Sequence, residues 1–171
     1  MSTQQPERTL VLLRHSKAEH VPGKADLARE LTPRGHRDAV AAGEWLVQHV
    51  PPVDQVVCSP SVRTRQTWEG VRRGGVVAGS VDERAEVYDA DPDTLMDLVR
   101  GAPDEVRCLL LVGHAPGVPL LVEDLAQAPA GDPLAEGFPT SALAVLRFAG
   151  GWSDLEAGGA RVEQVAVPRA G

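Results

Sequence analysis

The chain has 171 residues with 43% hydrophobic residues and a formal net charge of −7, which fits one domain over residues 1–171. No stretch approaches the ~20 apolar residues of a membrane span, and the acidic balance argues against nucleic acid as a partner. The first residues are polar and lack the apolar core of a signal peptide, so we expect a cytoplasmic monomer whose residues 1–7 form a disordered lead-in.

Apolar runs alternate with amphipathic segments along the chain. We expect strands at 9–13, 53–58, 76–82, 107–112, 141–148 and 161–167, the last two joined by a glycine-rich hairpin. Between them we expect helices at 33–50 and 61–73, a helix capped by Asp91 or Asp93 and ended by Gly101, and a helix at 117–128. Long loops cover 15–30 and 129–139. This alternation predicts a three-layer α/β/α sandwich with a mostly parallel central sheet.

Three of the expected strands are each followed closely by a histidine or an arginine. Arg14 and His15 end the first run, Arg63 lies just after the second, and His114 follows the strand at 107–112. Ligands of such sheets bind beyond the carboxyl ends of the strands. A lone residue of either kind is usually structural, but several buried cations together need an anion between them. Phosphate is the natural anion, because its oxygens match the guanidinium fork.

Three motifs resemble the signatures of the histidine phosphatase superfamily, also called the phosphoglycerate mutase-like group. They are Arg14-His15-Ser16, the segment SPSVRTRQT at 59–67 and the segment GHAPG at 113–117. The segments at 31–35 and 139–143 resemble its small SixA-type phosphohistidine phosphatase branch, and the resemblance extends from about Thr9 to Phe148. The family usually has glycine where this chain has Ser16, which we interpret as a tolerated small residue.

A histidine between two phosphate-binding arginines is well placed to attack phosphorus, and the resemblance assigns this role to His15. His15 must be neutral, with one ring nitrogen held by a hydrogen bond, and we expect a backbone carbonyl to hold it. We expect His114 to be protonated and to bind the phosphoryl oxygens together with Arg14 and Arg63. The pKa values of the two imidazoles should then be pushed apart.

The leaving group also needs a proton. The wider superfamily implies a carboxylate in the loop after the second helix, and Glu86 is the best-placed candidate, with Asp26 and Glu19 as alternatives. A phosphohistidine substrate would relax this need, because imidazole leaves more easily than an alkoxide.

These residues predict a metal-independent phosphatase without a cofactor, acting on phosphohistidine protein or on a small phosphomonoester. One alternative is a module that binds a phosphoprotein without turnover, and another is a phosphoglycerate-type mutase. No Cys/His spacing resembles a zinc site. Cys58 and Cys108 lie in apolar runs, and we expect them to be buried small hydrophobes without a disulfide.

Overall fold

A computed structural model describes residues 6–127 and 132–171 of the chain. In this part, six strands form one sheet in the order β3-β2-β4-β1-β5-β6. The strands are β1 (Glu7–Arg14), β2 (Val53–Cys58), β3 (Ala78–Glu83), β4 (Cys108–Gly113), β5 (Leu143–Ala149) and β6 (Arg161–Ala166). The pairs among β3, β2, β4 and β1 are parallel, whereas β5 is antiparallel to both β1 and β6. The predicted α/β/α sandwich with a mostly parallel sheet is confirmed.

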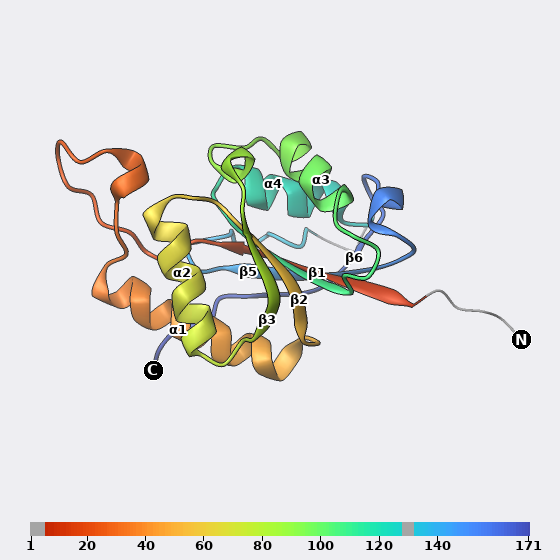
Figure 1. The fold of residues 1–171 in the computed structure, drawn as a ribbon, viewed down its shortest axis with the longest axis horizontal. Coiled ribbons are helices and arrows are strands. Elements are labelled where there is room, and N and C mark those ends of the chain that lie inside the picture. The colour runs from red at the N-terminus through yellow and green to blue at the C-terminus, as the bar shows by residue number, and fades with distance from the viewer. Residues whose placement is uncertain (1–5, 128–131) are drawn as a thin grey trace, which may run out of the picture.

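In the described part of the chain, four α-helices cover the two faces of this sheet (Figure 1). They are α1 (Pro33–His49), α2 (Val62–Arg73), α3 (Pro92–Arg100) and α4 (Gly117–Leu125). Helices α1 and α2 lie on one face, and α3 and α4 lie on the other. Helix α4 ends at Leu125, earlier than predicted, and residue 128 of the predicted helix lies outside the described residues.

The apolar runs of the central strands are buried on both faces. Leu10 and Leu12 of β1 point into the core beneath α3 and α4, whereas Val11 and Leu13 point into the core beneath α1 and α2. Successive strand residues face opposite sides, so a continuous apolar run is what a strand covered by helices on both faces requires. Each leucine buried in this way stabilises the fold by about 1.5–3 kcal/mol.

Side chains that cap the helices fix where each helix begins. The Thr32 hydroxyl accepts a hydrogen bond from the Gly35 amide at 3.0 Å, with Pro33 in the first helical turn. Asp91 accepts from the Thr94 amide at 2.8 Å, so Asp91 rather than Asp93 is the cap of α3. Each cap satisfies an amide that the helix leaves without a partner.

The first residues form more strand than the sequence indicates. Residues 1–5 of the expected lead-in lie outside the described residues, but Glu7 begins β1 and is paired with Ala149 of β5. The prediction is wrong for Glu7 because β5 is long enough to give it a partner, which its polar side chain does not reveal.

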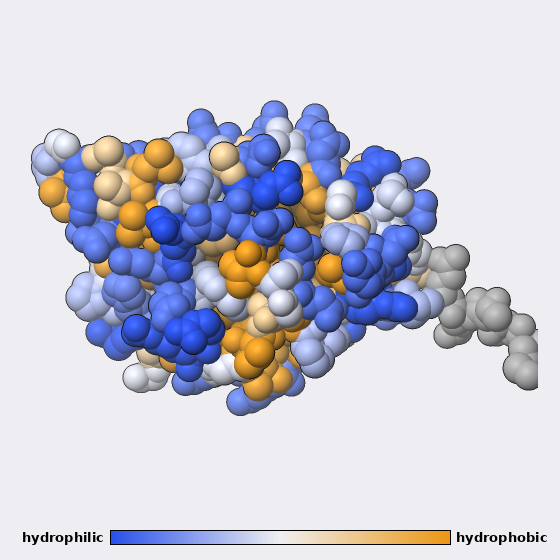
Figure 2. Space-filling model, in the orientation of Figure 1, coloured by the Kyte–Doolittle hydropathy of each residue, from blue (hydrophilic) through white to orange (hydrophobic). Residues whose placement is uncertain are grey.

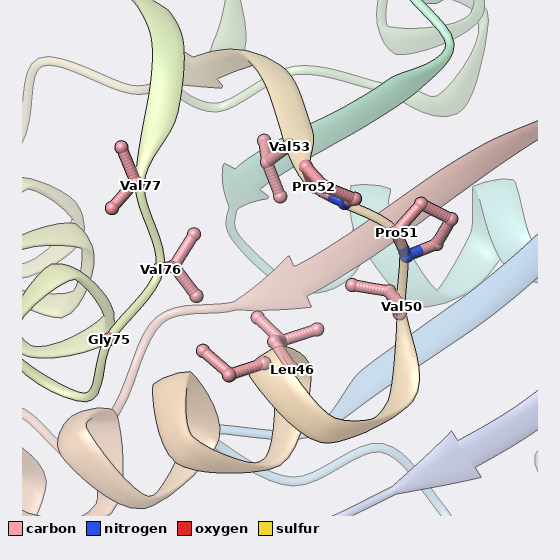
Figure 3. A pocket seen from close by; sticks show the side chains of 9 residues that line it. Leu46, Val50, Pro51, Pro52, Val53, Gly75, Val76 and Val77 are labelled. Atoms are coloured by element: carbon pink, nitrogen blue, oxygen red, sulfur yellow. The ribbon is translucent and has the colours of Figure 1, made fainter.

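An apolar hollow of about 230 Å³ lies at the end of the sheet where β2 begins (Figure 3). It is lined by Leu46 and Val47 of α1, by residues 50–53 and by residues 75–77. Figure 2 shows apolar side chains gathered in the middle of the visible face, among polar ones.

No helix among the described residues is long and apolar enough to cross a membrane.

Candidate active site

The three strands that deliver the predicted site residues are neighbours in register. Arg14 of β1 is opposite Gly113 of β4, and Val112 of β4 is opposite Cys58 of β2. The chain therefore leaves all three strands at one level, where His15, Ser59 and His114 follow. The His15 amide donates to the Gly113 carbonyl at 3.0 Å, so pairing continues one residue past β1.

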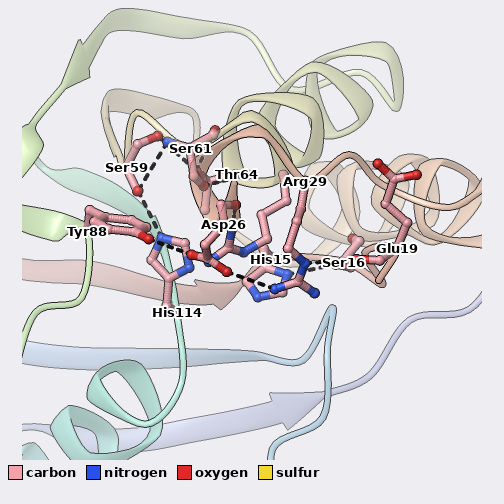
Figure 4. Close-up of polar contacts among 11 residues, drawn as sticks. His15, Ser16, Glu19, Asp26, Arg29, Ser59, Ser61, Thr64, Tyr88 and His114 are labelled. Atoms are coloured by element: carbon pink, nitrogen blue, oxygen red, sulfur yellow. Dashed lines mark hydrogen bonds and ion pairs between the residues drawn. The ribbon is translucent and has the colours of Figure 1, made fainter. Parts of the chain in front are cut away.

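The His15 ring is oriented by main-chain hydrogen bonding. Its Nδ1 lies 2.7 Å from the Ser16 carbonyl oxygen, and a carbonyl only accepts, so Nδ1 carries the proton. The expected backbone carbonyl is confirmed. Nε2 of the neutral ring is then the unprotonated nitrogen. The rings of His15 and His114 lie close together, with centroids 5.4 Å apart (Figure 4).

Arg63 lies in the first turn of α2 and is held by the long loop at 15–30. Its Nη1 donates to the Asp26 main-chain oxygen at 2.8 Å, and its Nη2 donates to Asp26 Oδ2 at 3.0 Å. The Asp26 carboxylate also accepts hydrogen bonds from Tyr88 and Arg29. The Tyr88 hydroxyl, then Arg29 and Arg63, lower the pKa of Asp26 far below its usual range, so this carboxylate is ionised.

Three buried nitrogens of the site have no hydrogen-bond partner within the described part of the chain. They are Nε of Arg14, Nε of Arg63 and Nδ1 of His114. His114 Nε2 lies 2.8 Å from the Ser59 hydroxyl, and Arg14 Nη1 donates to the Phe138 carbonyl at 3.0 Å. Buried polar groups are nearly always paired in native proteins. Three adjacent basic side chains thus each keep a buried nitrogen for which the described residues supply no acceptor.

Both imidazoles are neutral at ordinary pH. Burial, followed by the nearby Arg63 and Arg14 charges, lowers the pKa of His15 to about 4, against the opposing effect of the Ser16 carbonyl. Burial, followed by Arg63 and His15, lowers the pKa of His114 to about 3. The expectation of separated pKa values, with His114 protonated, is not met in the free protein. The two rings share one buried, cationic surrounding, which acts on both in the same direction.

Arg14, His15, Arg63 and His114 line one cleft of about 620 Å³. The other lining residues are Lys17, Ala18, His20, Arg29, Arg34, Asp38, Ala115, Thr140 and Arg169. Six of the lining side chains are arginine or lysine, and one is a carboxylate. In a chain with a net charge of −7, this local concentration of positive charge suits the binding of an anion.

Comparison with known proteins agrees with this geometry. The model of the histidine phosphatase superfamily (branch 1) matches residues 10–86. A solved structure from Nakamurella multipartita, assigned as the phosphohistidine phosphatase SixA, is 36% identical, with 96% of this chain and 98% of that chain covered at a TM-score of 0.86. This chain belongs to the histidine phosphatase superfamily.

Two further relatives align with most of the chain. A Mycobacterium tuberculosis protein is 40% identical over 163 residues, which cover 92% of this chain and 100% of the relative. A phosphohistidine phosphatase SixA homolog from Haemophilus influenzae is 28% identical over 127 residues, which cover 68% of this chain and 76% of the relative. The predicted phosphatase class and the predicted SixA-type relationship are confirmed.

The three candidate acids of this histidine phosphatase lie in different surroundings. Glu86 is not among the cleft-lining residues, and its carboxylate pairs with Arg84 at 3.3 Å. Glu19 accepts from Lys24 Nζ at 2.5 Å, and Asp26 is bound to Arg63. The structure therefore brings Asp26, but not Glu86, to the four basic residues. A catalytic role for Glu86 stays a prediction.

Ser16 does not line the cleft. It is fully buried, its hydroxyl lies 3.0 Å from that of Ser141, and its amide donates to the Thr67 hydroxyl at 3.0 Å. The Ser141 amide in turn donates to the His15 carbonyl at 3.0 Å. Ser16 therefore links the segment that carries His15 to α2 and to the turn before β5, a role that the sequence does not reveal.

Proposed function

We propose that this chain is a metal-independent phosphatase in which His15 carries a covalent phosphohistidine intermediate. The observation that supports this most is the convergence of Arg14, His15, Arg63 and His114 on one cleft, with three unpartnered basic nitrogens among them. A phosphoryl group would supply the missing acceptors.

In the first step, the lone pair of His15 Nε2 attacks phosphorus while the bond from phosphorus to the leaving group breaks. The leaving group takes that electron pair and then a proton from solvent. Arg14 and Arg63 offset the charge on the phosphoryl oxygens. In the second step, water attacks the phosphorus, the bond to His15 breaks, the water proton passes to solvent, and inorganic phosphate is released.

His114 acts as a hydrogen-bond donor to the phosphoryl group. Ser59 Oγ accepts from the Ser61 amide at 3.4 Å, which leaves its own proton to donate to His114 Nε2. The ring proton of neutral His114 is then on Nδ1, one of the three unpartnered nitrogens. A bound phosphate dianion would also raise the pKa of His114 and favour its protonated form.

The ionised state of the carboxylates supports one substrate class over the other. The pKa of Glu19 is lowered by Lys24, that of Glu86 by its own backbone amide and by Arg84, and that of Asp26 by Tyr88. All three are ionised near neutral pH and are therefore poor general acids. We infer that the leaving group is the imidazole of a phosphohistidine, which needs less help from an acid than an alkoxide does.

The convergence of four basic residues on one cleft also favours one other candidate function, a module that binds a phosphorylated protein without turnover. The free Nε2 of His15 supports the enzyme. Incubation with an aryl phosphate and with a phosphohistidine peptide separates the two. We expect phosphate release from the peptide at a higher kcat/KM than from the aryl ester, whereas tight phosphate binding with no release from either would establish the module.

Replacement of the nucleophile tests the intermediate. We expect His15→Ala to abolish turnover and to abolish acid-labile phosphate labelling of the protein, while His36→Ala, at an exposed position of α1, retains both. A chelator should change neither measurement in the wild type. Labelling that persists in His15→Ala, or turnover that stops with the chelator, would contradict the proposal.

A further inference from the structure

The cleft holds more positive charge than one phosphoryl group requires. Beyond Arg14 and Arg63, it is lined by Lys17, Arg29, Arg34 and Arg169. Arg29 donates to the Asp26 carboxylate at 3.1 Å and shares it with Arg63, so both belong to the site already described. Lys17 is exposed and makes no ion pair with any residue that the structure describes. Arg34 and Arg169 come from distant parts of the chain and meet at one carboxylate.

That carboxylate is Asp38, which is buried at 3% exposure on α1. Its Oδ2 lies 3.6 Å from Arg34 Nε and 3.4 Å from Arg169 Nη1. Its Oδ1 accepts from the Ala170 amide at 3.2 Å, and Arg169 Nη2 donates to the Thr140 carbonyl at 3.1 Å. Asp38 thus fixes the segment after β6 against α1 and holds two guanidinium groups beside each other.

We propose that Arg34 and Arg169, positioned by Asp38, form a second anion subsite that binds a carboxylate or a further phosphate carried by the substrate beside its transferable phosphoryl group. This inference rests on the proposed function, because it adds a specificity site to the same cleft. One buried negative charge faces two arginines, so the pair keeps a net positive charge. Each guanidinium has five N–H donors, of which Asp38 and Thr140 occupy only a part.

The size of the cleft agrees with a substrate of this kind. Ligand pockets of about 300–1,000 Å³ bind drug-sized molecules, and the cleft of about 620 Å³ lies within that range. A planar guanidinium binds a carboxylate or phosphate through two parallel hydrogen bonds. The shared ligand chemistry is therefore an anionic group near a phosphoryl group, which either an acidic residue beside a phosphohistidine or a small phosphocarboxylate would supply.

Binding of non-hydrolysable ligands tests the subsite without relying on turnover. The probes are alkylphosphonates and the matching phosphonocarboxylates, which differ by one carboxylate, compared by calorimetry over a series of chain lengths. We expect the carboxylate to raise affinity about tenfold at one preferred length. Equal affinities within each pair at every length would overturn the subsite, whereas turnover with His15 labelling would be unaffected by that result.

Substitution of the two arginines tests whether they cause the gain in affinity that the carboxylate gives. Arg169→Gln and Arg34→Gln should each reduce the affinity ratio of the paired ligands several-fold, and Arg169→Lys should restore part of it because lysine keeps the charge. The matched control is Arg161→Gln, an exposed arginine of β6 that pairs with Glu7, which should keep the wild-type ratio. A ratio that falls equally in the control would overturn the assignment. Should Arg169→Gln unfold, Arg34→Gln, whose side chain is 61% exposed, carries the test.

Phosphohistidine peptides identify the source of the second anion. A peptide with glutamate beside the phosphohistidine is compared with one that has glutamine, using kcat/KM in the wild type and in Arg169→Gln. A preference for glutamate that Arg169→Gln removes identifies a protein substrate. A carboxylate gain confined to the small phosphonates identifies a small molecule. Binding of neither phosphonate would instead contradict the phosphate site that the proposed function requires.

Discussion

The two cavities at opposite ends of β2 differ in nearly every property. Where β2 begins, Val53 borders a hollow lined by valine, leucine and proline side chains. Where β2 ends, Ser59 contacts His114 at the edge of a cleft rich in arginine. Among the residues that the structure describes, no acid, base or nucleophile lines the apolar hollow, whereas buried nitrogens without hydrogen-bond partners border the cleft. Chemistry is therefore expected at the carboxyl end of the sheet, and the other end should serve stability.

The largest effect that separates the two regions is expected at Arg63. Arg63→Gln removes one of the charges that hold the phosphoryl group, and we expect kcat to fall about 10²–10³-fold. The matched control is Arg65→Gln on the same helix, because Arg65 pairs with Glu83 at 2.8 Å and lies outside the cleft-lining set. Steady-state kinetics on a phosphohistidine peptide should show an almost unchanged kcat for the control. A similar loss in both variants would mean that α2, rather than the cleft, is disturbed.

The opposite pattern is expected at Leu46, which is fully buried and lines the apolar hollow. Leu46→Ala should lower the free energy of unfolding by about 2–5 kcal/mol through lost packing. The control is Val47→Ala, at a half-exposed neighbour in the same hollow, with a change of about 0.5 kcal/mol or less. Urea unfolding measures both. Activity per folded molecule should stay at the wild-type level, and a large drop in kcat for Leu46→Ala would show that the two ends of the sheet are coupled.

The polar end should also make stability depend on pH. The pKa values of His15 and His114 are lowered to about 4 and about 3 in the folded protein, whereas the unfolded chain keeps the ordinary value near 6.5. Between these values the unfolded state binds more protons, so stability falls as the pH drops below about 6.5. Each imidazole contributes up to about 2 kcal/mol of this loss by about pH 5.

The free energy of unfolding, measured at about pH 7 and about pH 5, should therefore fall less between these pH values in the double variant His15→Asn/His114→Gln than in the wild type. Saturating phosphate should also reduce the loss in the wild type, because a bound dianion favours the protonated imidazoles. An identical loss in the wild type and the double variant would mean that the two rings are not buried as neutral groups.

The sequence predicts the core of the site better than its surroundings. Arg14, His15, Arg63 and His114 could be found because each lies within a few residues of the end of an apolar run, and parallel strands bring such ends together. Asp38 and Arg169 could not be found in this way. They lie on a helix and in the segment after β6, far apart in sequence, and their meeting depends on how α1 packs against the sheet. Periodicity gives no information about such a contact.

The smallest effect is expected at Ser16, where the sequence suggested a tolerated small residue. Ser16→Gly removes the hydroxyl that lies 3.0 Å from that of Ser141 and leaves a buried polar group without this partner, at a cost of about 1 kcal/mol. Ser141 has a φ of 67°, in the left-handed region, so Ser141→Gly loses the same hydrogen bond but relieves backbone strain and should cost less. Because the Ser16 carbonyl that holds His15 is retained in both variants, kcat should change less than in Arg63→Gln. Thermal unfolding and kinetics on the same preparations check both points, and a kcat loss as large as that of Arg63→Gln would place the Ser16 hydroxyl in the reaction itself.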